Sequence, residues 1–266
     1  CSNDLFNRTF NLINWAIKSN MASVLTDCTP REKLGWLEEA HLVGPSIRYN
    51  YNISGLCRKI VKDMINAQTA DGLVPDIAPE FVQFEGGFRD SPEWGSNSII
   101  LPWYLYSWYG DREILAEAYP MMQRYINYLQ KKSSGNILSY GLGDWFDIGP
   151  GNPGESQLTP RGVTATAIYY YDLDILGKVA KLLGRRQDVQ NYGALAGKVR
   201  AAFNKAWFNK DTKQYATGSQ AANAMPVYMG LVEPEYKEAV IGNIIKDIRE
   251  RKNSLTAGDI GYRYLL

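Results

Sequence analysis

The sequence is poor in the residues that build most metal and nucleophile sites. Its 266 residues contain one histidine and three cysteines, which are Cys1, Cys28 and Cys57. A single histidine argues against a histidine-based triad or a multi-histidine metal site. Three cysteines without a C-x-x-C spacing argue against a disulfide framework or a zinc site. Any chemistry is therefore expected to rest on carboxylates, with no cofactor and no metal.

Charge of one sign and long apolar runs are scarce as well. The formal net charge is +1, so neither a nucleic acid nor a membrane surface is expected as a partner. No stretch reaches about 18 uninterrupted apolar residues, which a membrane-spanning helix needs. Aromatic side chains are plentiful, because 7 Trp and 18 Tyr contribute to an aromatic content of 12%. Most of these rings suit a core, and a few suit stacking on a sugar.

Apolar residues recur at helical spacing along almost the whole chain, which predicts an all-α fold. Helices are predicted over residues 6–21, 53–64, 97–109, 111–132, 162–183, 187–207, 221–231 and 234–251, and "LTAGDIGYRYLL" (255–266) resembles the start of a ninth. Trp15, Trp103 and Trp108 follow this periodicity and are expected in the core. The long connections 69–96, 133–160 and 208–220 are rich in Gly and Pro, and we expect ordered loops at one end of a helical array.

The segment "TDCTPREKLGWLEEAH" (26–41) concentrates carboxylates beside an indole ring. A carboxylic acid that donates a proton at neutral pH needs a raised pKa, which burial or a neighbouring like charge supplies. Glycoside hydrolysis needs such an acid on the leaving oxygen and a second carboxylate across the sugar. The ordinary alternative is that Glu32 pairs with Arg31 or Lys33 on the surface and that Trp36 is a core ring.

The exact order of residues 27–39, Asp-Cys-Thr-Pro-Arg-Glu-Lys-Leu-Gly-Trp-Leu-Glu-Glu, is more specific. It resembles the D-C-P-Q-R-[DE]-[RK]-x-G-W-x-G-D signature of the α-L-rhamnosidases of glycoside hydrolase family 78. The segments "ADGLVPDIAP" (70–79), "EWGSNSIILPWYLYSWYGD" (93–111), "GDW" (143–145) and "GSQAANAMPVYMGLV" (218–232) occur in the order that such enzymes show. The resemblance implies an (α/α)6 barrel that releases terminal α-L-rhamnosyl residues with inversion.

The resemblance also implies roles for individual residues. Glu32 aligns with the general acid. The residues implied to surround or wall the bound rhamnose are Asp27, Arg31, Trp36, Glu39, Trp94, Asp144 and Trp145. The implied general base is a Glu in a later segment, and no segment before Leu266 matches it. Residues 1–266 are therefore predicted to form a single, C-terminally incomplete catalytic domain of about eight helices and the start of a ninth. Flanking domains of the parent chain are expected.

Three departures from the signature put the preferred sugar in doubt. Thr29-Pro30 replaces Pro-Gln, Glu38-Glu39 replaces Gly-Asp, and Ser96 stands where many members have Asp. A glycosidase for another sugar and a non-catalytic carbohydrate-binding helical domain therefore stay open as alternatives. A periplasmic or extracellular location is favoured over a cytoplasmic one.

Other polar residues have plainer interpretations. The acidic run from Asp76 to Glu93 fits no EF-hand spacing and is expected to be a solvated loop. His41 is expected to be a packing residue and not a catalyst.

Overall fold

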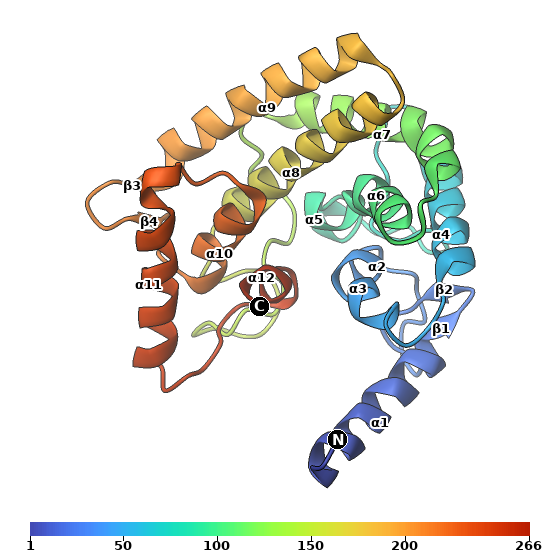
Figure 1. Cartoon of the computed structure of the whole chain (residues 1–266), viewed down its shortest axis with the longest axis horizontal. Coiled ribbons are helices and arrows are strands. Elements are labelled where there is room, and N and C mark those ends of the chain that lie inside the picture. The colour runs from blue at the N-terminus through green and yellow to red at the C-terminus, as the bar shows by residue number, and fades with distance from the viewer.

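The computed structural model describes residues 1–266, and helices dominate it (Figure 1). The helices are α1 (Asp4–Asn20), α2 (Glu38–Leu42), α3 (Gly44–Ile47), α4 (Ser54–Ala67), α5 (Pro92–Gly95), α6 (Asn97–Tyr109), α7 (Arg112–Lys132), α8 (Arg161–Leu182), α9 (Arg186–Trp207), α10 (Gln220–Met229), α11 (Lys237–Glu250) and α12 (Asp259–Leu265). Two 3-10 turns, η1 (Gly86–Phe88) and η2 (Pro234–Tyr236), complete the helical elements. The strands form two small antiparallel hairpins, β1 (Met21–Ala22) with β2 (Val24–Leu25) and β3 (Phe208–Asn209) with β4 (Gln214–Tyr215).

The long helices form an inner and an outer layer around an arc. Figure 1 shows α6, α8 and α10 toward the inside, with α7, α9 and α11 outside them. Each inner helix contacts the outer helix that follows it in the chain, and α6, α8, α10 and α12 contact one another in turn. The short helix α12 also contacts α2, so the N-terminal and C-terminal parts of the arc meet. This arrangement of helical hairpins confirms the predicted all-α toroid.

The ends of the helices follow from local chemistry. The Asp111 carboxylate caps α7 by accepting a hydrogen bond from the Ile114 N–H at 3.1 Å. Gly110 ends α6 with a φ of 71°, a left-handed conformation that glycine adopts without a steric penalty. The eight predicted helices and the start of the ninth are all present. The short helices α2, α3 and α5 were not predicted, because four or five residues are too few to show a helical period.

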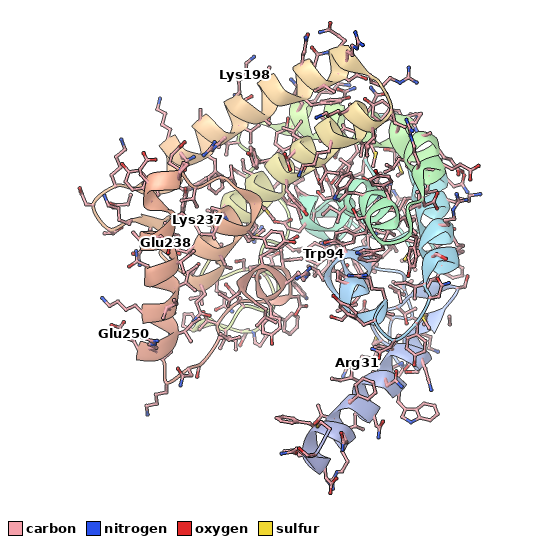
Figure 2. All side chains as sticks on the ribbon, in the orientation of Figure 1. Arg31, Trp94, Lys198, Lys237, Glu238 and Glu250 are labelled. Atoms are coloured by element: carbon pink, nitrogen blue, oxygen red, sulfur yellow. The ribbon has the colours of Figure 1, made fainter.

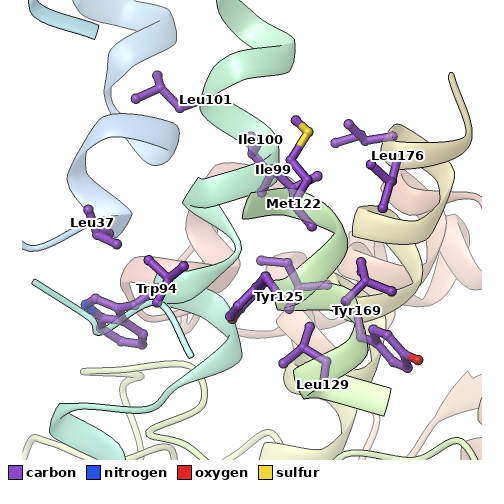
Figure 3. Close-up of a cluster of buried hydrophobic side chains, with 14 of the residues drawn as sticks. Leu37, Trp94, Ile99, Ile100, Leu101, Met122, Tyr125, Leu129, Tyr169 and Leu176 are labelled. Atoms are coloured by element: carbon purple, nitrogen blue, oxygen red, sulfur yellow. The ribbon is translucent and has the colours of Figure 1, made fainter. Parts of the chain in front are cut away.

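A continuous apolar core fills the space between the two layers (Figure 3). Ile99 and Ile100 of α6 pack with Met122 of α7 and Leu176 of α8, and all four side chains are fully buried. Trp94 and Leu37 belong to the same cluster, on the side of the core nearest α2. The core therefore supports the segments that carry the motif residues.

Helix α1 departs from the expectation that its apolar stripe faces inward. None of its residues is buried, and Trp15 is 69% exposed, so the prediction of Trp15 as a core residue is wrong. Figure 1 shows α1 projecting away from the arc, where its neighbours are the β1–β2 hairpin and Tyr51, whose hydroxyl donates to Asn14. Trp103 and Trp108, by contrast, are partly buried against the core, as expected. No helix combines the length and the apolar character that crossing a lipid bilayer requires.

Candidate active site

The segment that carries Glu32 is held in a tight turn between β2 and α2. Its backbone is fixed by Cys28, whose carbonyl accepts from the Lys33 N–H at 3.2 Å and whose sulfur accepts from the Glu32 N–H at 3.3 Å. Lys33 has a φ of 59°, a left-handed conformation that is uncommon for a residue with a side chain. Gly35 then pairs with Ala78, and a side chain at Gly35 would meet the Ala78 carbonyl at 3.0 Å. The Leu-Gly-Trp part of the motif is thus fitted against residues 76–78.

Glu32 is oriented by Trp36. The Trp36 Nε1–H donates to Glu32 Oε2 at 2.8 Å, a distance typical of a good hydrogen bond to a carboxylate. Glu32 forms no ion pair with Arg31 or Lys33, so the surface-pairing alternative is wrong. Trp36 is only 8% exposed and contacts the core, but its ring also faces the cavity described next. It is both a core ring and a site ring.

Glu32 and Trp36 lie on the wall of a cavity of about 280 Å³. This volume lies just below the usual range for small-molecule sites, about 300–1,000 Å³. The lining residues are Asp27, Glu32, Trp36, Glu38, Glu39, Phe88, Trp94, Leu142, Trp145 and Asp259. Five of these ten carry carboxylates, four carry aromatic rings, and none is basic, so the cavity disfavours an anion and offers acceptors for hydroxyl donors beside apolar ring faces.

Like charges and burial perturb the acids at one side of the cavity. Burial raises the pKa of Glu39 to about 7, with further contributions from the neighbouring carboxylates of Asp259 and Asp27. Burial, together with the charge of Glu39, raises the pKa of Glu38 well above its usual value. Burial also raises the pKa of Asp259. A raised pKa was expected of the general acid, which the resemblance places at Glu32. The acids of the motif whose pKa burial raises are instead Glu38 and Glu39, and Glu32 is exposed.

Several polar atoms of the lining residues have no hydrogen-bond partner within the chain. They include Trp94 Nε1, Asp27 Oδ1 and Glu38 Oε2, each of which is shielded from solvent. Trp94 as a whole is 2% exposed. A buried donor or acceptor without a partner is costly, at about 1–3 kcal/mol. Other atoms of this kind, such as Ser98 Oγ and Tyr169 Oη, lie away from the cavity. On the cavity wall, Trp94 Nε1 can donate to a sugar hydroxyl and Asp27 Oδ1 can accept from one. No three acidic, histidine or cysteine side chains are arranged to bind a metal ion.

Two of the predicted site residues are not on the cavity wall. Arg31 is exposed, and Figure 2 shows it near the base of α1, apart from Trp94 at the centre of the view. Asp144 is fully buried, and its carboxylate accepts hydrogen bonds from the Gly258 N–H at 3.0 Å and the Gly261 N–H at 2.7 Å. Burial raises the pKa of Asp144 to about 6 despite these two bonds. Contact of Arg31 or Asp144 with a sugar stays a prediction.

The acidic run between residues 76 and 93 is not uniformly solvated. Asp76 and Glu93 are fully buried, so the expectation of a solvated loop is wrong for these two. Burial raises the pKa of Glu93 to about 7. Its backbone carbonyl accepts from His41 Nε2 at 2.8 Å, and burial lowers the pKa of His41 to about 4. His41 therefore ties α2 to α5 as a neutral packing residue, as expected.

Ser96, one of the departures from the family signature, also lies away from the cavity. It is fully buried, and its hydroxyl donates to Asp172 Oδ2 at 2.5 Å. Burial holds the pKa of Asp172 well above its usual value. Ser96 therefore forms a buried hydrogen bond between the start of α6 and α8. An aspartate at this position would place a second carboxylate beside that of Asp172.

Four cavity residues were not singled out as site residues from the sequence, namely Glu38, Phe88, Leu142 and Asp259. Glu38 lies inside the motif, where Glu38-Glu39 replaces the Gly-Asp of the family signature. Phe88 and Asp259 come from a turn and a helix far away in the sequence, and folding alone brings them to Glu32. Glu38, Glu39 and Asp259 also line an adjacent groove of about 640 Å³, whose other walls include Phe146, Ile148 and Tyr262.

Comparison with known proteins assigns the chain to a family. Residues 1–266 match the family described as the bacterial alpha-L-rhamnosidase 6 hairpin glycosidase domain, and the chain belongs to that family. An alpha-L-rhamnosidase of Streptomyces avermitilis is 31% identical over 264 residues, which are 98% of this chain and 24% of that protein. An alpha-L-rhamnosidase of Formosa agariphila is 32% identical and is aligned over 100% of this chain and 29% of its own length. The chain thus spans about a quarter to a third of these relatives.

Solved structures agree with the family assignment. The alpha-L-rhamnosidase of Dictyoglumus thermophilum superposes with a TM-score of 0.92 at 33% identity, over 100% of this chain and 30% of that one. The Streptomyces avermitilis alpha-L-rhamnosidase, solved with L-rhamnose, superposes with a TM-score of 0.87 at 30% identity, over 98% of this chain and 24% of that one. The predicted (α/α)6 barrel fold and the predicted family are therefore confirmed.

Proposed function

We propose that the full-length protein hydrolyses terminal α-L-rhamnosyl residues with inversion of the anomeric carbon. The observation that carries this proposal is the single cavity that joins Glu32 to a shell of carboxylates and indole rings in a chain of this family. Two relatives bear the name alpha-L-rhamnosidase, and one similar structure holds L-rhamnose. Five acidic residues on the cavity wall would repel the carboxylate of a uronic acid, which favours a sugar without a carboxylate.

In this proposal Glu32 is the general acid. It protonates the glycosidic oxygen as the bond from that oxygen to the anomeric carbon breaks, while water attacks the opposite face of the sugar. Trp36 holds the Glu32 carboxyl in place through its N–H. The wall atoms Trp94 Nε1 and Asp27 Oδ1 bond the sugar hydroxyls, and the apolar faces of Trp94 and Trp145 cover the ring.

The general base is proposed to be a glutamate outside residues 1–266, as the resemblance to the family implies. In inverting enzymes the acid and base stand about 6.5–9.5 Å apart, which leaves room for the water. Asp259 lies in the same cavity as Glu32, but we assign it a different task. It raises the pKa of Glu39, a neighbour on the cavity wall.

The proposal is tested by incubating the full-length protein with methyl α-L-rhamnoside and following the released sugar by proton NMR. The first anomer released should be β-L-rhamnose, and the α anomer should appear only by mutarotation. Methyl glycosides of α-D-mannose, α-L-fucose and α-D-glucuronic acid serve as comparison substrates. If one of these is hydrolysed faster than the rhamnoside, its sugar and not rhamnose is the preferred substrate. Binding of rhamnose without hydrolysis of any glycoside would favour the non-catalytic alternative.

A further inference from the structure

Glu38 is a cavity residue to which the proposed reaction gives no role. It lines both the cavity of the candidate active site and the adjacent groove of about 640 Å³. The family signature has glycine at this position, so the side chain is a departure from the signature. The Leu37 N–H donates to the Asp76 carbonyl at 2.9 Å, and His41 Nε2 bonds to the backbone of α5 at 2.8 Å. The turn of α2 that carries Glu38 is therefore fixed before a ligand arrives.

Carboxyl groups surround Glu38, and no cation is paired with it. The titratable side chains around Glu38, on the walls of the two spaces or among its charged neighbours, are Asp27, Glu32, Glu39, Tyr49, Asp76, Asp259, Tyr262 and Arg263. Arg263 of α12 is the one basic residue in this set, and Glu38 forms no ion pair with it. Glu38 Oε2 is shielded from solvent and has no hydrogen-bond partner. Because each ionised neighbour makes the next ionisation harder, such a group of acids favours a state in which one of them keeps its proton.

Glu38 is the acid of the motif that keeps its proton to higher pH. Burial is the main cause that raises the pKa of Glu38 well above its usual value, and the charge of Glu39 adds to the effect. The pKa of Glu39 is raised to about 7. Glu39 therefore ionises first as the pH rises, and its charge then helps to hold the proton on Glu38.

The cavity wall has more hydrogen-bond acceptors than donors for a sugar. A hydroxyl group donates one hydrogen bond and can accept two. Ionised carboxylates only accept, and the Trp36 N–H already donates to Glu32. Apart from the proton that Glu32 transfers, the side-chain donors left on the wall are the N–H groups of Trp94 and Trp145. A neutral Glu38 adds an O–H donor to this wall.

We propose that Glu38 binds the sugar as a neutral carboxylic acid that donates its proton to a sugar hydroxyl, and that it is a specificity-determining residue which the family signature lacks. This inference rests on the proposed function for the identity of the ligand, but not for the protonation of Glu38. Sugar binding should weaken when the pH rises far enough to ionise Glu38, because the ionised side chain has no proton to donate.

The first experiment tests the protonation of Glu38 without a sugar. It records the infrared difference spectrum between the full-length wild-type protein and Glu38→Gln at neutral pH. We expect the carbonyl band of a protonated carboxyl group in this difference. Glu85→Gln is the control, because Glu85 is exposed and lines neither space, and its difference spectrum should contain carboxylate bands. Carboxylate bands in the Glu38 difference spectrum would overturn the proposal.

The second experiment measures the Kd of L-rhamnose by calorimetry for the full-length wild type, Glu38→Ala and Glu38→Gln. At neutral pH Glu38→Ala should bind about tenfold more weakly, the scale of one hydrogen bond. Glu38→Gln should restore most of this loss, because an amide can also donate. Raising the pH should weaken binding by the wild type more than binding by Glu38→Gln. The other acids of the wall are present in both proteins, so the ratio of their Kd values reports on Glu38 alone.

Analogues of L-rhamnose that each lack one ring hydroxyl identify the group that Glu38 contacts. The difference in Kd between the wild type and Glu38→Ala should disappear for one of these analogues, because that analogue lacks the partner of the Glu38 proton. A difference that persists with every analogue would overturn the hydroxyl contact.

Three further results would overturn the proposal. If Glu38→Gln binds as weakly as Glu38→Ala, an ionised Glu38 is needed. If Glu38→Ala binds as tightly as the wild type, Glu38 does not contact the sugar. If the Kd ratio of the wild type and Glu38→Gln is the same at every pH, Glu38 does not act through its proton, and this comparison stands even if Glu38→Ala fails to fold.

A wild-type protein that neither cleaves rhamnosides nor binds L-rhamnose would contradict the proposed function. The sugar of whichever comparison glycoside it cleaves then replaces L-rhamnose in the binding experiment. The infrared experiment needs no ligand, so it still decides whether Glu38 carries a proton.

Discussion

Replacement of Glu32 by glutamine is the most direct test of the proposed acid. The glutamine side chain has the same shape and keeps a carbonyl oxygen that can accept the Trp36 Nε1–H, which now lies 2.8 Å from Glu32 Oε2. The turn around Glu32 is fixed by backbone bonds to Cys28 and is independent of the carboxyl group. The substitution therefore removes the transferable proton and leaves the cavity wall in place.

The loss of kcat/KM that we expect depends on how strongly the leaving group needs a proton. General acid catalysis contributes about 10²–10⁴-fold to the rate, which corresponds to about 2.7–5.4 kcal/mol in the activation free energy. The full loss should appear in kcat/KM with methyl α-L-rhamnoside, because methoxide is a poor leaving group and needs the proton. With 4-nitrophenyl α-L-rhamnoside the loss should be at least tenfold smaller, since the phenolate departs without protonation. The free energy of unfolding should change by about 1 kcal/mol or less, the scale of one hydrogen bond.

Glu85→Gln is the control, because Glu85 is exposed, lies outside the cavity and forms no ion pair or side-chain hydrogen bond. It should behave as the wild type on both substrates. If Glu32→Gln cleaves methyl α-L-rhamnoside within tenfold of the wild-type rate, Glu32 is not the acid. The reasoning also fails if both substrates lose the same factor, because that result would indicate a binding role.

Three further substitutions test the acids around the cavity. Asp259→Asn should lower the pKa of Glu39 from about 7, so the acid limb of the kcat/KM profile should move to lower pH if ionised Glu39 binds the sugar. The control Asp211→Asn, on the exposed β3–β4 turn, should not move it, and a 10³-fold loss of kcat in Asp259→Asn would instead make Asp259 the base. Asp144→Asn should lower the free energy of unfolding by about 1–3 kcal/mol in urea denaturation, because the amide oxygen can replace only one of the two carboxylate oxygens that accept from the Gly258 and Gly261 N–H groups. An unchanged stability with a raised KM would show a sugar contact. Glu93→Gln should flatten the pH dependence of the free energy of unfolding. The folded-state pKa of Glu93 is about 7 against a usual 4.5, so the wild-type free energy of unfolding should fall by up to about 3 kcal/mol as the pH rises from 4.5 to 7. An unfolding temperature that falls equally with pH in both proteins would contradict this.

The long helices could be predicted because their apolar residues repeat over three or more turns. Helix α7 has its predicted bounds within a residue, since the Asp111 cap and the Ser133 end are local signals. The orientation of α1 could not be predicted in the same way. Its stripe of Phe6, Phe10 and Ile13 has a helical period, but the neighbours of α1 in the fold decide whether the stripe is buried, and these side chains are at least half exposed.

The site was predictable where its residues are contiguous. Asp27, Glu32, Trp36 and Glu39 share one short segment with a specific order, and all four line the cavity. Arg31 belongs to the same segment but is exposed and lies outside the cavity lining. Other positions depend on folding: Phe88 and Asp259 reach the cavity from distant segments that carry no motif of their own.

The loop at residues 143–147 couples two walls of the cavity that come from opposite parts of the chain. Trp145 supplies a ring, and its carbonyl accepts from the Asp259 N–H at 2.8 Å. The Asp144 carboxylate accepts from the N–H groups of Gly258, just before α12, and of Gly261 within it. A side chain at Gly258 would lie 2.1 Å from the Trp145 carbonyl oxygen, so α12 can dock only with glycine at that position. The placement of the Asp259 charge therefore depends on Asp144, although Asp144 does not line the cavity. Substitutions at Asp144 and Asp259 should consequently be non-additive, because the first already displaces the carboxylate that the second removes.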